Sequence, residues 1–142
     1  CISAGRIWVL KELIGRALLA REQAYAPYSN FSVGAALRGK SGKIYPGCNV
    51  ENAAFGASIC AERVALARAI SEGEREFLQL AIVADLPKGP TPCGICRQAL
   101  WEFGDLQIIT ANLAGDATVY TLGELLPHAF GDFRRGDGFE NS

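Results

Sequence analysis

Three cysteines and one glutamate form the group of residues with the clearest chemical potential in this chain. Cys93 and Cys96 make a Cys-x-x-Cys pair, and Cys60 stands upstream with Glu62 two residues after it. Three thiolates are soft ligands that suit a divalent zinc ion. A structural zinc site takes four protein ligands, whereas a catalytic site takes three and keeps one position open for water. We therefore predict a catalytic zinc site, at whose water Glu62 moves protons.

Two arginines follow the predicted ligands closely. Both cysteine segments are expected to begin helices, where free backbone N–H groups lower the pKa of a thiol and favour the thiolate. Three thiolates outweigh the charge of a dication, and the excess negative charge would weaken zinc as a Lewis acid. We expect Arg63 and Arg97 to donate hydrogen bonds to the sulfurs and so to offset this excess.

Two other interpretations of the cysteines compete with the catalytic site. A Cys-x-x-Cys pair can be a redox centre, but a redox centre would not need Cys60 or Glu62. A structural zinc site would need a fourth ligand, for which Cys48 and His128 are the candidates. Cys48 falls within a predicted strand and is expected in the core, and His128 lies in a turn well after the motifs. The catalytic interpretation is favoured because it uses every residue of the group.

Composition limits the classes of protein to consider. The 142 residues are 49% hydrophobic, which suits one domain with one core, and we assign residues 1–131 to it and 132–142 to a flexible tail. A net charge of −1 argues against a nucleic-acid partner. No apolar run is long enough to span a membrane. Five cysteines, an odd number that includes a Cys-x-x-Cys pair, favour a metal site in a reducing compartment, by default the cytoplasm.

The elements that must position these residues can be read from periodicity and turn signals. Small residues at Gly34, Ala35 and Ala36 indicate that another element approaches the first strand closely. Ser58 is the expected cap of the second helix, whose apolar residues on nearly all sides predict that Glu62 is buried. Helices are predicted at about 6–24, 60–71 and 92–104, and a further short helix is predicted after the capping box of Thr121 and Glu124. Strands are predicted at about 31–38, 43–50, 78–84, 106–110 and 119–120. This order predicts an α/β fold, a three-layer α/β/α sandwich with a central mixed five-stranded sheet.

The chain resembles the small, three-cysteine class of cytidine deaminases from about residue 21 to 130. Zinc-dependent nucleobase deaminases combine three ligands with a glutamate beside the first. Four motifs carry the resemblance, in the family's order: Ala24-Tyr-Ala-Pro-Tyr-Ser-Asn-Phe-Ser-Val-Gly-Ala-Ala36, Gly47-Cys-Asn-Val-Glu-Asn-Ala53, Cys60-Ala-Glu-Arg63 and Pro92-Cys-Gly-Ile-Cys-Arg-Gln98.

The resemblance implies a set of substrate contacts. Phe31 would pack on the pyrimidine ring, Asn49 and Glu51 would hold a ribose hydroxyl, and the backbone of Ala61 would face the base. These roles suit the residue types, since aromatic faces stack on bases and amide and carboxylate groups bond hydroxyls. The alternative interpretation of Phe31, less favoured even without the resemblance, is a core aromatic at the start of a strand.

The resemblance also implies a reaction and an assembly. Glu62 would first accept and then donate a proton during hydrolytic deamination of cytidine and deoxycytidine to uridine and deoxyuridine, with release of ammonia. One Zn²⁺ would be bound per subunit. The assembly would be a homotetramer, in which Phe55 and Phe130 are the candidates to cross a subunit interface.

Three alternative functions remain at this point. A deaminase of a modified aminopyrimidine nucleoside such as blasticidin S is the nearest, although Asn49 and Glu51 favour a ribosyl substrate. A deaminase of cytosine in RNA or single-stranded DNA would call for a basic groove. A non-catalytic zinc-binding interaction module would make Glu62 dispensable and leave no position open for water.

Overall fold

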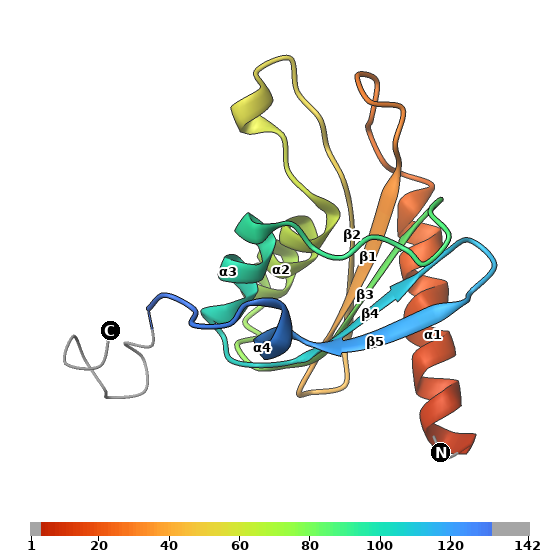
Figure 1. Cartoon of the computed structure of the whole chain (residues 1–142), viewed down its shortest axis with the longest axis vertical. Coiled ribbons are helices and arrows are strands. Elements are labelled where there is room, and N and C mark those ends of the chain that lie inside the picture. Colours follow the sequence, from red (N-terminus) through yellow and green to blue (C-terminus); the bar gives the residue numbers. More distant parts are fainter. Residues whose placement is uncertain (1–3, 132–142) are drawn as a thin grey trace.

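A five-stranded mixed sheet forms the centre of the protein, in a computed structural model that describes residues 4–131 (Figure 1). Its strands are β1 (Val33–Gly39), β2 (Ile44–Cys48), β3 (Phe77–Ala84), β4 (Gln107–Ala111) and β5 (Ala117–Thr121). They lie in the order β2-β1-β3-β4-β5, and only the β3–β4 pair is parallel. The predicted mixed sheet is confirmed.

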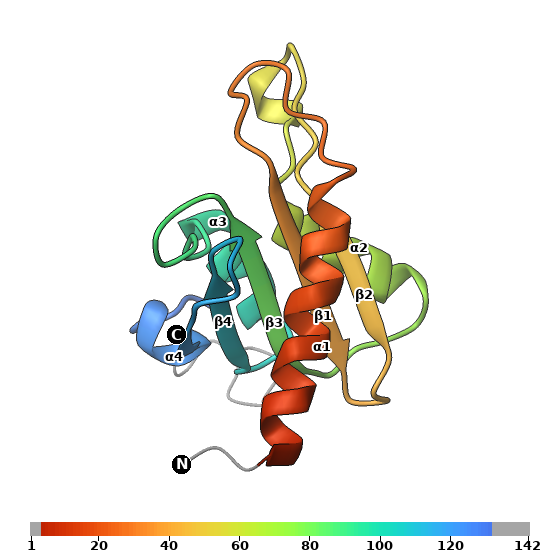
Figure 2. The same ribbon diagram turned by 90° about the vertical axis from the view of Figure 1, so that its right-hand side faces the viewer.

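Helices cover both faces of this sheet. One face carries α1 (Ala4–Arg21), and the other carries α2 (Ala61–Ser71), α3 (Gly94–Trp101) and the short α4 (Leu122–Leu125) (Figures 1 and 2). One core cluster lies under α1 and a second lies under the other three helices. The three-layer α/β/α sandwich is therefore also confirmed.

Alternation along β1 explains how one strand serves two cores. Ala35 and Leu37 point into the cluster beneath α2, and Ala36 points into the cluster beneath α1. The central strand β3 is buried from Leu80 to Ala84, as its continuous apolar run predicted. Leu78 is the exception, with 48% of its surface exposed.

Two glycines let the helices approach the sheet backbone. A Cβ atom on Gly34 would lie 1.9 Å from the carbonyl oxygen of Ala17 in α1, and one on Gly47 would lie 2.5 Å from the backbone nitrogen of Ala65 in α2. Both positions therefore exclude a side chain. The close approach predicted from the small residues of β1 is confirmed, and α1 is the element responsible.

Several predicted boundaries need correction. Ser58 is not the cap of α2, because Cys60 occupies the N-cap position and Ser58 ends a 3₁₀ turn, Phe55–Ala57. The Ser58 hydroxyl instead accepts a hydrogen bond from the backbone of Asn52. The first helix ends at Arg21 rather than near residue 24, and α3 ends at Trp101 rather than Gly104. The predicted tail, 132–142, lies outside the described residues.

The strand pairing brings four distant segments to one end of the sheet. Val33, at the start of β1, pairs with Ala84, at the end of β3, and Gly34 pairs with Cys48, at the end of β2. The chain before β1, the chain after β2 and the loop after β3 therefore meet there, beside the start of α2. In residues 4–131 no helix combines the length and apolarity needed to traverse a bilayer.

Replacing Gly34 with alanine tests the close contact between α1 and the sheet. We expect Gly34→Ala to lower the free energy of unfolding by about 3 kcal/mol, because the new methyl group meets backbone that must move. Gly15→Ala is the matched control. Gly15 lies within α1 with nothing near its Cβ position, so alanine there should raise stability by about 0.5–1 kcal/mol. Urea denaturation measures both, and a Gly34→Ala protein as stable as the unaltered one would contradict the packing.

Candidate active site

The three predicted ligands come together where two helices begin. Cys60 is the N-cap residue of α2 and Cys93 that of α3, and Cys96 lies in the first turn of α3. The Cys60 and Cys93 sulfurs are 3.8 Å apart, the Cys93 and Cys96 sulfurs are 3.5 Å apart, and all three lie within 4.8 Å of one another. A tetrahedral site with zinc–sulfur bonds of about 2.3 Å has sulfur–sulfur distances of about 3.8 Å. The cluster therefore fits zinc in both chemistry and size.

The surroundings of Cys60 favour its thiolate. A hydrogen bond from Cys96 lowers the pKa of the Cys60 thiol to about 5, against the opposing effect of burial. Arg63 adds to this, since its Nη2 lies 3.7 Å from the Cys60 sulfur. The predicted contact between Arg63 and a ligand sulfur is thus present. A pre-formed thiolate beside a guanidinium is suited to take up a cation.

Glu62 is buried beside the cluster, with only 5% of its surface exposed. Burial raises the pKa of its carboxyl group, and the nearby Cys60 charge raises it further. A carboxyl group whose pKa is raised can hold a proton as well as release one. That is the property required of a residue that acts first as base and then as acid.

A cavity of about 290 Å³ opens onto the cluster. This is near the lower end of the size range of small-molecule sites. Its lining includes every predicted substrate contact together with two ligands and the glutamate: Phe31, Asn49, Glu51, Ala61, Cys60, Cys93, Glu62, and in addition Ser29, Val33, Pro90 and Thr91. Sequence reasoning missed the last four, although Ser29 belongs to the same motif as Phe31.

Phe31 is fixed at the cavity by the backbone around it. Asn30, the residue before it, has a left-handed backbone with φ of 59°, which asparagine tolerates better than most residues. Asn49 then bridges the start of β1. Its Nδ2 donates to the carbonyl oxygen of Phe31 at 2.8 Å, and its Oδ1 accepts from the amide of Val33 at 2.9 Å. Asn49 therefore holds the segment that carries the aromatic ring.

Glu51 makes a similar connection to the loop before Phe31. Its Oε1 accepts from the backbone amides of Tyr28 at 2.9 Å and Ser29 at 3.1 Å, and its Oε2 accepts from the Ser29 hydroxyl. The hydrogen bonds from Ser29 lower the pKa of the Glu51 carboxyl group. Glu51 is thus kept ionised at the edge of the cavity.

The expectation for Arg97 needs correction. Its Nε donates to the carbonyl oxygen of Pro92 at 2.7 Å and its Nη1 donates to that of Leu125 at 2.6 Å, so these bonds go to backbone and not to a sulfur. Arg97 thereby fastens the residue before Cys93 to α4. Of the two arginines, Arg63 is the one whose contact with a ligand sulfur is observed, and Arg97 bonds the backbone on either side of the second ligand segment.

The remaining candidates lie away from the cluster. Phe55 and Phe130 are 78% and 71% exposed, and Phe55 meets the ring of Tyr28 edge-on. The metal-binding cluster found in residues 4–131 includes neither Cys48 nor His128, so neither serves as a fourth ligand there. This result argues against the structural-zinc interpretation.

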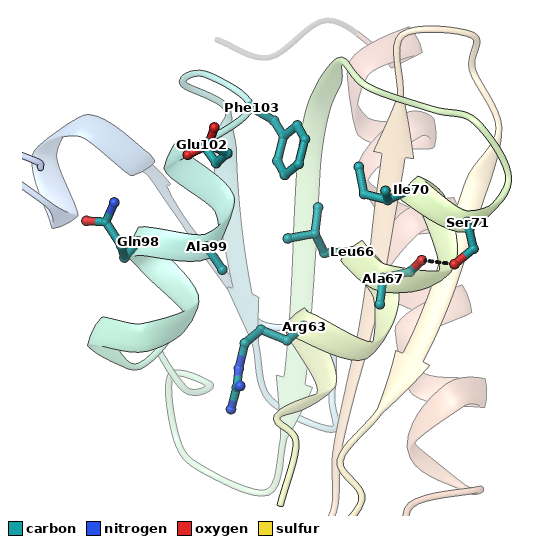
Figure 3. Close-up of a pocket in the computed structure, with 9 residues that line it drawn as sticks. All are labelled: Arg63, Leu66, Ala67, Ile70, Ser71, Gln98, Ala99, Glu102 and Phe103. Carbon is teal, nitrogen blue, oxygen red and sulfur yellow. Dashed lines mark hydrogen bonds between the residues drawn. The ribbon is translucent and has the colours of Figure 1, made fainter. Parts of the chain in front are cut away.

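A second hollow, of about 640 Å³, lies between α2 and α3 (Figure 3). Its lining is mostly apolar and comes from the two helices and the two residues that follow α3: Arg63, Leu66, Ala67, Ile70, Ser71, Gln98, Ala99, Glu102 and Phe103. Arg63 is the residue that links this hollow to the thiols. Within residues 4–131 its buried Nε atom has no hydrogen-bond partner.

The fold and the site together define a class of protein. Three thiols that fit one zinc ion, with a buried carboxyl group beside them at the floor of a small-molecule cavity, form the site of a zinc-dependent hydrolytic deaminase.

Comparison with known proteins agrees with this class. The profile of the cytidine and deoxycytidylate deaminase zinc-binding region matches residues 9–112. Cytidine deaminase from Sporosarcina psychrophila is 49% identical over 123 residues, covering 85% of this chain and 90% of that protein. A probable cytidine deaminase from Dictyostelium discoideum is 40% identical, covering 85% and 83%. The crystal structure of cytidine deaminase from Burkholderia pseudomallei is 48% identical, with a TM-score of 0.81 and coverage of 84% and 98%. The chain belongs to the cytidine and deoxycytidylate deaminase family.

Metal content tests the assignment of the ligands. We expect the unaltered protein to bind one zinc ion per chain and Cys96→Ala to lose it, because two thiolates hold zinc far more weakly than three. Cys48→Ala is the matched control, since Cys48 is a free cysteine outside the cluster and its removal should leave zinc bound. Mass spectrometry of metal content measures all three proteins. Full zinc in Cys96→Ala would overturn the assignment.

Proposed function

We propose that this protein catalyses the hydrolytic deamination of cytidine and deoxycytidine, giving uridine or deoxyuridine and ammonia. The observation that carries the proposal is the position of Glu62, buried beside the three thiols and lining the same cavity as Phe31. The names of the relatives support the choice of substrate.

In the proposed mechanism, Glu62 moves the protons. Zinc held by Cys60, Cys93 and Cys96 would act as a Lewis acid that makes a water molecule acidic enough to attack. Glu62 accepts a proton from the attacking water and delivers it to N3 of the base, so that C4 becomes electrophilic. After the water oxygen has added to C4, Glu62 takes the remaining proton from the new C4 hydroxyl and passes it to the amino group. The C4–N bond then breaks, so that the oxygen becomes the C4 carbonyl as ammonia leaves.

The rest of the cavity would position the substrate. The ring of Phe31 supplies a stacking surface for the pyrimidine, and the backbone of Ala61 faces its polar edge. Asn49 and Glu51 each use part of their hydrogen-bonding capacity on the loop before β1. Each keeps further donor or acceptor capacity, which would hold a sugar hydroxyl.

Arg63 would set the charge of the metal site. Its guanidinium contacts the Cys60 sulfur from the side of α2 away from the cavity, and so withdraws negative charge without occupying substrate space. Less charge on the sulfurs leaves zinc a stronger Lewis acid.

The rival functions make less use of these features. An interaction module with structural zinc would not require a buried Glu62 at the floor of a cavity. An enzyme acting on cytosine in RNA or DNA would require a basic groove, which a net charge of −1 does not favour. A deaminase of a modified aminopyrimidine nucleoside such as blasticidin S shares the same chemistry and is the second candidate. Competition between the two substrates in one assay would separate them.

We also propose that residues 1–131 work as one catalytic domain in a cytoplasmic homotetramer. The three thiols must stay reduced to hold zinc, which supports a reducing compartment. The exposed rings of Phe55 and Phe130 and the apolar hollow between α2 and α3 support contacts with further copies. A carbonyl group from a second copy would give the buried Nε of Arg63 the acceptor it requires.

Sedimentation measures the proposed assembly. We expect the protein to sediment at four times the chain mass. Ile70→Glu should reduce that mass, because it places a charge in the hollow between α2 and α3. Leu78→Glu, an exposed apolar position on β3 outside that hollow, is the control and should leave the mass unchanged. A monomeric unaltered protein would refute the tetramer.

Replacing Glu62 tests the proposed reaction. We expect the zinc-loaded protein to convert cytidine to uridine, followed by ultraviolet absorbance. Glu62→Gln should bind zinc but turn over at least about 10³-fold more slowly, because the amide cannot carry the protons. Glu76→Gln, a change to a largely exposed carboxylate, is the control and should keep full activity. Near-normal turnover by Glu62→Gln would exclude the proposed role, and no turnover by the zinc-loaded protein would favour the modified-nucleoside substrate.

A further inference from the structure

The hydroxyl of Ser29 joins two residues that line the cavity. It donates to Oε2 of Glu51 and accepts from the backbone amide of Phe31 at 3.0 Å. One small side chain therefore connects the carboxylate proposed to hold the sugar with the residue proposed to stack on the base. Ser29 is itself part of the cavity wall.

This connection adds to the backbone hydrogen bonds between Tyr25 and the chain at Asn49 and Glu51, which also join the loop before β1 to the chain after β2. Glu51 receives three hydrogen bonds from that loop, and two of them come from Ser29. On the other side of Phe31, Asn49 binds its carbonyl oxygen. Both backbone polar groups of Phe31 are thus bonded to side chains, one to Ser29 and one to Asn49.

The local backbone is one that such an attachment helps to hold. Phe31 follows Asn30, whose left-handed conformation costs more than an ordinary one and persists only when surrounding bonds hold it. The amide of Asn30 bonds the carbonyl oxygen of Ala26, which closes the turn. Without Ser29, that turn would keep its own hydrogen bond but lose its link to Glu51 through the hydroxyl.

Ser29 and Glu51 also separate the substrate cavity from a neighbouring hollow of about 430 Å³. Both residues line both spaces, and the second space is completed by Tyr28, Asn52, Phe55 and Ser58. The bonded pair therefore forms a shared wall. A wall that loosens would enlarge the cavity on the side where the sugar is proposed to bind.

We propose that Ser29 is a positioning residue that couples the sugar-binding carboxylate of Glu51 to the base-stacking ring of Phe31. This inference rests on the proposed function, because it takes the cavity as the nucleoside site. Ser29 does not touch the reacting atoms. It fixes the distance between the Glu51 carboxylate and the Phe31 ring, so that the sugar and the base of one nucleoside can contact them at the same time.

The coupling predicts which kinetic constant changes. Ser29→Ala removes a hydrogen bond to an ionised group and one to a backbone amide, so substrate binding should weaken and KM should rise about tenfold. The thiols and Glu62 lie on α2 and α3 and are not bonded to Ser29, so kcat should change less than about threefold. Ser29→Thr keeps the hydroxyl and should restore KM.

A serine at the opposite end of β1 provides a matched control. Ser41 makes the same pair of bonds, since its hydroxyl donates to Glu74 and accepts from the amide of Lys43, two residues on. It lies in the turn between β1 and β2, away from the cavity. Ser41→Ala should leave both kcat and KM unchanged.

The experiment combines kinetics with hydrogen exchange on the zinc-loaded protein. Cytidine turnover gives kcat and KM for the unaltered protein, Ser29→Ala, Ser29→Thr and Ser41→Ala, and NMR gives the exchange rate of the Phe31 amide. The proposal is supported if Ser29→Ala alone raises KM and speeds that exchange. It is overturned if Ser29→Ala leaves KM unchanged, or if Ser41→Ala raises it equally. No turnover by the unaltered protein would refute the proposed function instead, and the Phe31 exchange rate would then decide whether Ser29 holds that residue.

Discussion

The site depends on two helix N-termini meeting at one end of the sheet. Cys60 and Cys93 each occupy the N-cap position of a helix, and neither helix bonds its cap through a side chain. The thiols are therefore available for a metal while the helix ends favour their negative charge. That meeting requires α2 to lie directly on β2, which the missing side chain of Gly47 permits. The absence of a side chain at Gly47 thus allows the N-terminus of α2 to place Cys60 in the metal site.

Charge compensation explains the residues around the thiols. A buried carboxylate beside thiolates is costly, and burial accordingly raises the pKa of the Glu62 carboxyl group, with a further contribution from the Cys60 charge. Arg63, its neighbour in α2, lines the second hollow and contacts the Cys60 sulfur. Successive residues of one turn therefore line different spaces. Glu62 lines the cavity beside the thiols, where we propose that it moves protons, and Arg63 lines the second hollow, from which we propose that it balances negative charge.

The sequence predicted the layers, the strand set and the metal cluster because each has a local signal. Apolar periodicity located the elements, and the spacing of Cys60, Glu62 and the Cys-x-x-Cys pair indicated the chemistry. The sequence also predicted that Arg63 would contact a ligand sulfur.

Sequence reasoning gave the wrong partners for Arg97, because the acceptors at Pro92 and Leu125 are backbone carbonyls whose positions depend on how α4 packs. It missed Ser29 for a similar reason, since its hydrogen bond to Glu51 joins segments 22 residues apart. The cap of α2 was also predicted wrongly, as Ser58 has the favoured residue type but the chain places Cys60 at the cap, whereas the predicted capping box of Thr121 and Glu124 is present.

The coordination of zinc is the most direct test of a catalytic rather than a structural metal site. X-ray absorption at the zinc edge, on the full-length protein loaded with one zinc ion per chain, distinguishes sulfur from oxygen neighbours. We predict three sulfur atoms at about 2.3 Å and one oxygen at about 2.0 Å, the oxygen being the water beside Glu62. Four sulfur neighbours, or a nitrogen ligand in place of the oxygen, would mean that the site is closed by protein. Such a site could not activate water, and that result would contradict a catalytic role for the metal.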